Sequence, residues 1–182
     1  MLGWRGASRY YDSRFKPAFE MECQAMKRAI ETFGLKNISV MVPFCRTPEE
    51  GKRVKDIIRE YLKETKIYVM AEIPSNVLLI NEFLDIFDGM SIGSNDLTQL
   101  VVAIDRDNAN LAKIANENNE SVKKMIKEII KVCRQRKKYV GICGQAPSDY
   151  PEFADFLVKE GITAISLNPD TVIKTILYLC SK

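Results

Sequence analysis

The chain has 182 residues, of which 46% are hydrophobic and 28% are charged, and this composition indicates one globular domain. The formal net charge of +3 is too weak to indicate a nucleic-acid partner, and no apolar run approaches the ~20 residues that cross a bilayer. The sequence contains no histidine, which excludes histidine-based triads, histidine metal ligands and a phosphohistidine carried by this chain. Because no apolar core segment marks a signal peptide near the N-terminus, we expect a cytoplasmic protein.

Amphipathic helical patterns alternate with short apolar runs along the whole chain. In chain order we expect a helix at 15–33, a strand at 38–44, a helix at 47–64, a strand at 67–73, a helix at 75–87, a strand at 90–96, a helix at 121–138, a strand at 139–145, a helix at 148–161, a strand at 162–168 and a helix at 168–182. Thr47 and Ser75 are the expected N-caps of the second and third helices. The segment 97–120, which is rich in Asn and Asp, is expected to be an active-site loop with short helical pieces.

The alternation of strand and helix predicts an α/β fold, either a doubly wound sheet or part of a (β/α)8 barrel. The predicted strands are nearly continuous apolar runs, which is typical of a parallel sheet that is covered on both faces. No repeat, low-complexity segment or linker interrupts the pattern. We therefore expect residues 1–182 to form a single domain.

Unusual residues stand at the ends of three predicted strands, where parallel β/α folds bind their ligands. Glu72 and Asp96 are carboxylates at two neighbouring strand ends. A pair of this kind suits a hard cation such as Mg²⁺, which takes one or two protein carboxylates and completes its shell with other oxygens. The alternatives are a Glu that reaches the surface and an Asp that belongs to a turn or a helix cap.

A cysteine, Cys143, stands at the end of a third predicted strand, with Gly141 before it and Gly144 after it. One interpretation is a small buried hydrophobe, as we expect for Cys23, Cys133 and Cys180 on apolar helix stripes. The other is a proton carrier, because the glycines would clear space for a small substrate and a nearby cation would favour the thiolate. The five cysteines are far apart in sequence, which indicates reduced thiols rather than a disulfide framework.

Arginines occur in predicted loops. Arg5 lies between Trp4 and Gly6, a setting that suggests a guanidinium placed to bind a carboxylate or a phosphate. Simple solvation is the alternative. The lysine-rich pattern of 121–138 indicates the solvated face of an amphipathic helix rather than a nucleic-acid patch.

Seven stretches resemble a known family in order along the chain: "MLGWRGASRYY", "VMVPFCRTPEEG", "VMAEIPSN", "DGMSIGSNDLTQL", "AIDRDN", "GICGQAPSDYPEFA" and "SLNPDTV". They are similar to the C-terminal phosphoenolpyruvate (PEP)/pyruvate-binding domain of the PEP synthases, the pyruvate, water dikinases, within the PEP-utilising enzyme family. The "RGASRY" and "GQAPSD" stretches favour this branch over pyruvate, phosphate dikinase and enzyme I of the sugar phosphotransferase system.

The resemblance implies a PEP/pyruvate-type (β/α)8 TIM barrel. Such barrels need eight strands and typically ~250 residues, so the chain is expected to hold the C-terminal portion, about five β/α units, and to be N-terminally truncated. The implied activity is that of a gluconeogenic phosphotransferase with paired acceptors, a kinase that converts ATP, pyruvate and water to AMP, PEP and phosphate through a phosphohistidine. The expected partners are pyruvate or PEP, the ATP-grasp and phosphohistidine domains of the full enzyme, and a second copy in a homodimer. We expect the isolated piece to be inactive.

The resemblance also implies roles for individual residues. Glu72 and Asp96 would bind Mg²⁺, the implied cofactor, and Cys143 would exchange the methyl proton of pyruvate. The implied substrate-binding residues are Arg5, Glu72, Gly93, Ser94, Asn95, Asp96 and Arg106. Arg9 matches the same pattern without a defined role.

Three other functions remain open. The chain is alternatively a non-catalytic fragment or dimerisation module, because an open parallel sheet has two unpaired edge strands. It is alternatively a fragment of pyruvate, phosphate dikinase, or an enzyme of the same superfamily with another reaction, such as carbon–carbon lysis.

Overall fold

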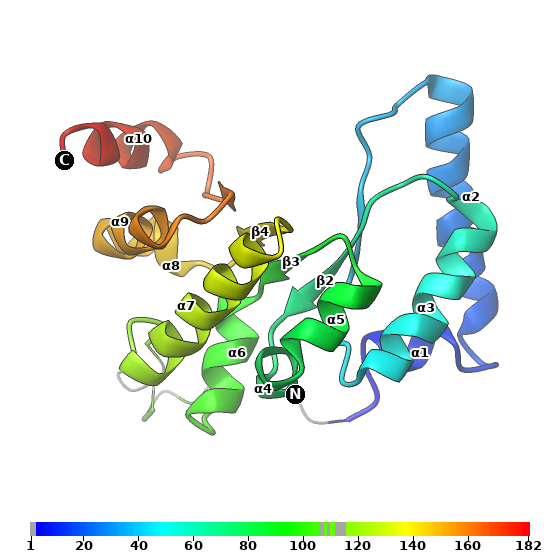
Figure 1. The fold of residues 1–182 in the computed structure, drawn as a ribbon, viewed down its shortest axis with the longest axis horizontal. Helices are drawn as coiled ribbons and strands as arrows, with labels where there is room; N and C mark the ends of the chain where they lie inside the picture. The colour runs from blue at the N-terminus through cyan, green and yellow to red at the C-terminus, as the bar shows by residue number, and fades with distance from the viewer. Residues whose placement is uncertain (1–2, 106–107, 109, 112–115) are drawn as a thin grey trace.

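The computed structural model of the chain describes residues 3–105, 108, 110–111 and 116–182 (Figure 1). Its centre is a parallel sheet in which every strand pairs with the next one along the chain, in the order β1-β2-β3-β4-β5. The strands are β1 Val40–Val42, β2 Ile67–Ala71, β3 Gly89–Ile92, β4 Tyr139–Ile142 and β5 Ala164–Ile165. The predicted parallel α/β class is confirmed. A sequential order has no switch point, so the described sheet is not doubly wound, whereas the partial barrel stays a prediction.

Helices connect these strands and lie beside them. They are α1 Ala7–Tyr10, α2 Lys16–Phe33, α3 Pro48–Tyr61, α4 Pro74–Leu78, α5 Ile80–Ile86, α6 Ser94–Val101, α7 Glu120–Gln135, α8 Ala146–Asp149, α9 Pro151–Glu160 and α10 Val172–Cys180. Figure 1 shows α3, α5 and α7 on one side of the sheet, with α2 at one end of the row and α10 at the other. Within the described residues, no helix is long and apolar enough to cross a membrane.

The core lies between the sheet and these helices. In β2, the side chains of Ile67, Val69 and Ala71 are fully buried, whereas Tyr68 and Met70 are only partly buried. The middle residue of β1, Met41, is 41% exposed. The expectation that both faces of the sheet are covered is therefore wrong for β1 and β2. The continuous apolar runs were misleading, because the side chains on the partly exposed face of these strands are also mostly apolar.

The strands are shorter than predicted at their carboxyl ends. The strand expected at 90–96 ends at Ile92, and residues 94–96 form the first turn of α6. Ser94, Asn95 and Asp96 therefore stand on a helix and not on a strand, which agrees with the alternative that "SND" belongs to a helix start. The predicted loop at 97–120 accordingly begins with the remainder of α6, which ends at Val101.

Two helix starts were predicted from caps, with different outcomes. Thr47 is the N-cap of α3, as expected, and its hydroxyl accepts a hydrogen bond from the backbone N–H of Glu50 at 3.2 Å. Ser75 is not a cap, because α4 begins one residue earlier at Pro74, a residue whose fixed φ suits the first turn of a helix. The hydroxyl of Ser75 donates instead to the backbone carbonyl of Arg46 at 2.9 Å.

Two predicted helices are each divided in two. The helix expected at 75–87 is α4 followed by α5, and Leu79, between them, leaves helical geometry with ψ of 34°. The helix expected at 148–161 is α8 followed by α9, and the break at Tyr150 precedes a proline, which disfavours helical geometry in the residue before it. The last helix, α10, ends in Cys180, which is exposed and not buried as expected.

Candidate functional site

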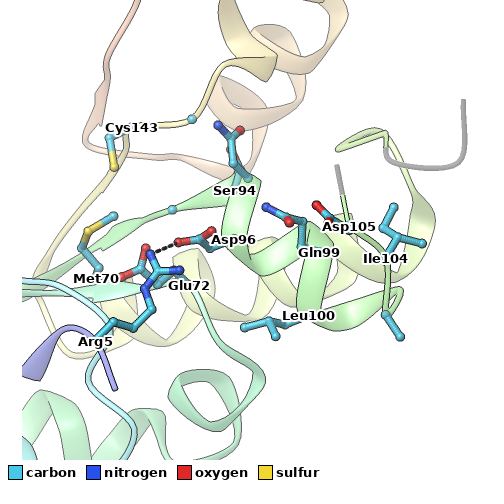
Figure 2. Close-up of a pocket in the computed structure, with 14 residues that line it drawn as sticks. Arg5, Met70, Glu72, Ser94, Asp96, Gln99, Leu100, Ile104, Asp105 and Cys143 are labelled. Carbon is cyan, nitrogen blue, oxygen red and sulfur yellow. Dashed lines mark hydrogen bonds and ion pairs between the residues drawn. The ribbon is translucent and has the colours of Figure 1, made fainter. Parts of the chain in front are cut away.

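A cavity of about 790 Å³ opens beside the carboxyl ends of β2, β3 and β4 (Figure 2). Its wall includes Arg5, Glu72, Gly93, Ser94, Asn95, Asp96 and Cys143. The strand ends, the start of α6 and the N-terminal segment thus bring seven of the eight predicted site residues together. The eighth, Arg106, lies outside the described residues.

Glu72 follows β2 and is only 4% exposed. Its Oε1 accepts a hydrogen bond of 2.6 Å from the backbone N–H of Phe44. The pKa of the Glu72 carboxyl is raised to about 7, mainly by burial; the Phe44 N–H and the Arg5 charge lower this pKa, whereas the negative charge of Asp96 adds to the rise. The predicted alternative, a Glu that reaches the surface, is therefore wrong. A buried carboxylate beside a second one costs free energy unless a cation neutralises the pair.

Gly93 makes room for this carboxylate. It lies between β3 and α6, and its backbone N–H donates to the carbonyl of Ala71 at 3.1 Å. A Cβ atom at this position would lie 2.8 Å from both Cβ and Oε2 of Glu72. Only glycine therefore lets the end of β3 pass this close to the Glu72 side chain.

Asp96 stands in the first turn of α6, where the positive end of the helix dipole favours a carboxylate. Its Oδ2 pairs with Nη2 of Arg5 at 3.1 Å, an interaction drawn as a dashed line in Figure 2. The Arg5 side chain is 41% exposed, so it also faces the open cavity. One guanidinium thus stands against two carboxylates, and the site holds an excess of negative charge when both are ionised.

The donor set fits a hard divalent cation. Among the described residues, no group of three or more His, Cys, Asp or Glu side chains could hold a metal ion. Glu72 and Asp96 offer two carboxylates, which is the protein contribution typical of Mg²⁺ sites that leave other positions to substrate oxygens and water.

Cys143 directly follows β4 and is exposed, so the interpretation of this residue as a buried small hydrophobe is wrong. Its backbone N–H donates to the carbonyl of Ile92 at 3.0 Å, which extends the pairing of β3 and β4 by one residue. The hydroxyl of Ser91 donates to its Sγ at 3.4 Å. This contact gives the thiol a polar neighbour at the edge of the cavity.

The glycines around Cys143 do not leave empty space, as the sequence suggested. A Cβ atom at Gly141 would lie 2.5 Å from the hydroxyl oxygen of Tyr139. A Cβ atom at Gly144 would overlap the hydroxyl of Ser94. The expectation of cleared substrate space at these two positions is therefore wrong, because neighbouring side chains fill it. Room for a ligand comes from the adjoining cavity.

Ser94 and Asn95 are held by other parts of the protein. The hydroxyl of Ser94, which is fully buried, donates to the carboxylate of Glu117. The side-chain oxygen of Asn95 accepts from the backbone N–H of Gln145 at 3.5 Å. Both residues line the cavity, and their contact with substrate stays a prediction. Arg9 is not among the described residues that line the cavity. Its guanidinium lies 4.2 Å from the ring centroid of Phe15.

Sequence reasoning missed several neighbours of the site. Five of them come from the end of α6 and the residues after it: Gln99, Leu100, Ala103, Ile104 and Asp105. Three others are Met70, Ser91 and Phe44. Met70 lines the cavity, and Ser91 contacts the Cys143 thiol. Both lie two residues before a predicted site residue in sequence, and the two-residue period of a strand could have found them. Phe44 acts through its backbone N–H, for which the sequence holds no signal.

The chain is similar to known proteins over nearly its whole length. The family model described as PEP-utilising enzyme, PEP-binding domain matches residues 1–180. The chain belongs to this family. Among the curated relatives of this PEP-binding domain is a phosphoenolpyruvate synthase of Aquifex aeolicus, 56% identical over 97% of the chain and 21% of the relative. Others are the phosphoenolpyruvate synthases of Synechocystis sp. (54% identical; 98% of the chain, 22% of the relative) and of Escherichia coli (47%; 98% and 23%).

These matches confirm the resemblance inferred from the sequence, since the relatives carry the name phosphoenolpyruvate synthase and cover nearly the whole chain. The PEP-binding domain described here spans less than a quarter of the length of these relatives.

Proposed function

We propose that the chain is the substrate-binding and catalytic part of a PEP synthase, a cytoplasmic pyruvate, water dikinase of gluconeogenesis. The full enzyme would convert ATP, pyruvate and water to AMP, PEP and phosphate. The observation that carries the proposal is the convergence of Arg5, Glu72, Asp96 and Cys143 on one cavity in a PEP-binding domain. They come from four separate segments of the chain, and each offers chemistry that a three-carbon acid needs.

Glu72 and Asp96 would hold Mg²⁺, and pyruvate would bind beside them. When bound, the ion supplies Lewis-acid stabilisation of negative charge on the keto oxygen. Arg5 would bind the carboxylate or the incoming phosphoryl group, because its guanidinium is partly exposed toward the cavity and forms two parallel hydrogen bonds with such oxygens readily.

Cys143 would move the methyl proton. Its thiolate would take a proton from the methyl carbon of pyruvate, which leaves the enolate, and its thiol would return this proton in the reverse direction. The Ser91 hydroxyl donates to Sγ and would help to hold the sulfur in place for the transfer. The enolate oxygen would then accept a phosphoryl group from a phosphohistidine on another domain, because this chain has no histidine.

The binding test is calorimetry with oxalate, a planar mimic of the pyruvate enolate, in the presence and absence of Mg²⁺. We expect binding that requires Mg²⁺ and that is lost in Glu72→Ala. The matched control is Glu152→Ala in the first turn of α9, away from the cavity, which should bind like the wild type. Oxalate binding that is independent of Mg²⁺, or unchanged in Glu72→Ala, would contradict the proposed site.

The chemical test is exchange of the methyl protons of pyruvate with deuterated water, followed by NMR. Cys143→Ser should slow Mg²⁺-dependent exchange while oxalate binding persists, whereas Cys180→Ser, which changes another exposed thiol, should leave exchange unchanged. The chain alone should form no PEP from ATP and pyruvate, since it lacks the phosphohistidine.

A second candidate function is that of a homodimeric assembly module. It is favoured by α10, where Ile173 is 73% exposed and Leu177 is 66% exposed. Large apolar side chains gathered on one helix are typical of protein interfaces. Light scattering should give the mass of a dimer that Leu177→Lys reduces to a monomer. The control Leu78→Lys, at a 79% exposed leucine on α4, should remain dimeric. A wild-type monomer at all concentrations would exclude this candidate.

A further inference from the structure

Phe44 follows β1 in a backbone conformation that aromatic residues rarely adopt. Its φ is +45°, in the left-handed region, and its side chain is only 4% exposed. A buried, non-glycine residue keeps such a conformation only where the surrounding contacts determine it, and such residues cluster at functional sites. The contacts of Phe44 therefore indicate what this conformation achieves.

The backbone and the ring of Phe44 each contact a charged residue of the cavity wall. Its backbone N–H donates to Oε1 of Glu72 at 2.6 Å. Its ring centroid lies 4.3 Å from the guanidinium carbon of Arg5 and 4.9 Å from that of Arg46. The faces of an aromatic ring carry partial negative charge and attract cations at such distances. One residue thus holds a carboxylate with its backbone and two guanidinium groups with its ring.

The segment that carries Arg5 rests directly on Phe44. A Cβ atom at Gly6 would lie 2.4 Å from Cβ of Phe44 and 2.7 Å from its carbonyl oxygen. The backbone N–H of Ala7 donates to the carbonyl of Pro43 at 3.1 Å. Gly6 has a φ of +62° and no side chain, and both properties are needed for this close approach.

Arg46 fixes the same segment from outside the cavity. Its Nη1 donates to the carbonyl of Arg5 at 3.0 Å and to the hydroxyl of Ser8 at 3.2 Å, and its Nη2 donates to the carbonyl of Gly3 at 2.5 Å. Neither Arg46 nor Phe44 is among the described residues that line the cavity. Both can therefore influence a ligand only through other residues, which line the cavity.

We infer that Phe44, supported by Arg46, is a positioning residue that fixes the Arg5 guanidinium and the Glu72 carboxylate relative to each other in the cavity wall. As far as the ligand is concerned, the inference rests on the proposed function, in which Arg5 binds the phosphate or carboxylate of PEP. The placement of Arg5 by the Phe44 ring does not depend on that function and can be measured without a ligand.

The decisive variants separate the ring from the backbone. Phe44→Leu keeps an apolar side chain and the N–H to Glu72 but removes the ring face, whereas Phe44→Tyr keeps the ring face. In the 182-residue chain, the Arg5 Nε–H signal in NMR spectra should be shifted by the ring current of Phe44. We expect this shift to be lost in Phe44→Leu and retained in Phe44→Tyr. An unchanged Arg5 signal in Phe44→Leu would overturn the inference.

Binding of PEP with Mg²⁺ supplies the second readout. Phe44→Leu should weaken PEP binding about tenfold, the scale of a partly desolvated cation–π contact, and Phe44→Tyr should restore it. In an Arg5→Ala background, Phe44→Leu should cause no further loss, because the residue it positions is gone. Equal losses in both backgrounds would show a merely structural role and overturn the inference. Absence of Mg²⁺-dependent PEP binding in the wild type would contradict the proposed function, and the Arg5 signal would still decide the role of Phe44.

A third variant keeps the test valid if Phe44→Leu does not fold. Arg46→Gln removes the guanidinium that binds Gly3, Arg5 and Ser8 but leaves Phe44 in place. It should broaden the Arg5 signal and weaken PEP binding in the same direction. If Arg46→Gln keeps the sharp Arg5 signal at its wild-type position and binds PEP with wild-type affinity, the supporting role of Arg46 is overturned.

Discussion

The guanidinium of Arg5 lies 3.1 Å from the carboxylate of Asp96, although 91 residues separate the two in the chain. The pair joins the N-terminal segment to the first turn of α6 in the wall of the cavity. Its side chains are 41% and 20% exposed, and ion pairs that water reaches contribute only about 0–1 kcal/mol to stability. The importance of this pair is therefore positional, because it keeps a cation and a carboxylate at the same side of the site.

The first prediction concerns Asp96→Asn. This change removes the charge that pairs with Arg5 and one of the two proposed Mg²⁺ ligands. Mg²⁺-dependent oxalate affinity, measured by calorimetry, should fall by about tenfold or more, while the urea midpoint should change little because the pair is partly exposed. Asp155→Asn is the control, since it breaks a 2.6 Å surface pair with Lys159 on α9. Equal oxalate affinity in the two variants would rule out Asp96 as a ligand.

The sequence predicted that Glu72, Asp96 and Cys143 lie at one edge of the sheet, and the structure brings all three together in the cavity wall. Glu72 and Cys143 immediately follow parallel strands, and parallel strands place their carboxyl ends at one edge of a sheet. The position of Asp96 was predicted for a partly wrong reason, because β3 ends at Ile92 and Asp96 stands on a helix. A short loop after β3 brought it to the same edge, so the error in the strand boundary did not matter.

What the sequence did not predict depends on backbone geometry and on three-dimensional neighbours. The left-handed φ of Phe44 and its N–H contact with Glu72 arise from the turn after β1, and its side-chain type gives no sign of either. The space beside Gly141 was misjudged because the occupant, the Tyr139 ring, folds back over its own strand. A glycine in sequence shows that a side chain is absent, and it does not show what takes its place.

The second prediction concerns thiol reactivity. Burial raises the pKa of Cys23 to about 11 and the pKa values of Cys45 and Cys133 to about 12, so these thiols carry almost no thiolate at neutral pH. Cys143 and Cys180 are exposed. Mass spectrometry after iodoacetamide treatment should therefore show adducts on these two residues in the folded chain and on all five cysteines after denaturation.

Ligand protection extends this prediction. Mg²⁺ with oxalate should slow labelling of Cys143, which lines the cavity, and should not affect Cys180 on α10. Rapid labelling of a buried cysteine in the folded chain would contradict the described core. Equal protection of both exposed thiols would indicate a global effect rather than a ligand in the cavity.

The third prediction concerns Gly93→Ala. The added methyl group would meet Cβ and Oε2 of Glu72 at 2.8 Å and Cε of Met70 at 2.9 Å, so the carboxylate or the strand end must move. We expect a loss of stability of about 1–3 kcal/mol, as for other overpacked positions, together with loss of Mg²⁺-dependent oxalate binding.

Gly34→Ala is the control for the effect of a methyl group alone. Gly34 caps α2 with a φ of +68°, and no described atom beyond its chain neighbours lies within 4 Å of the place that a Cβ atom would take. The control should lose about 1 kcal/mol or somewhat more through backbone strain and keep its oxalate affinity. Wild-type oxalate binding in Gly93→Ala would show that the contact with Glu72 does not constrain the site.

The fourth prediction concerns pH. The folded pKa of Glu72 is about 7, above its ordinary value of 4.5, mainly because the carboxyl is buried. Between these values the folded state keeps a proton that the unfolded state has released, so the free energy of unfolding falls as pH rises through this range. A shift of this size corresponds to about 3 kcal/mol in the free energy of unfolding. The folded chain has this stabilisation in full below pH 4.5 and has lost it above pH 7.

Glu72→Gln isolates this effect, because glutamine is neutral at every pH and its side-chain oxygen can still accept the N–H of Phe44. In urea unfolding with a metal chelator present, the variant and the wild type should differ little near pH 4.5, and the variant should become the more stable protein as pH rises to about 8. The control Glu60→Gln, at an exposed position of α3, should follow the wild-type profile. Parallel pH profiles for Glu72→Gln and the wild type would show that the buried carboxyl does not hold its proton at neutral pH.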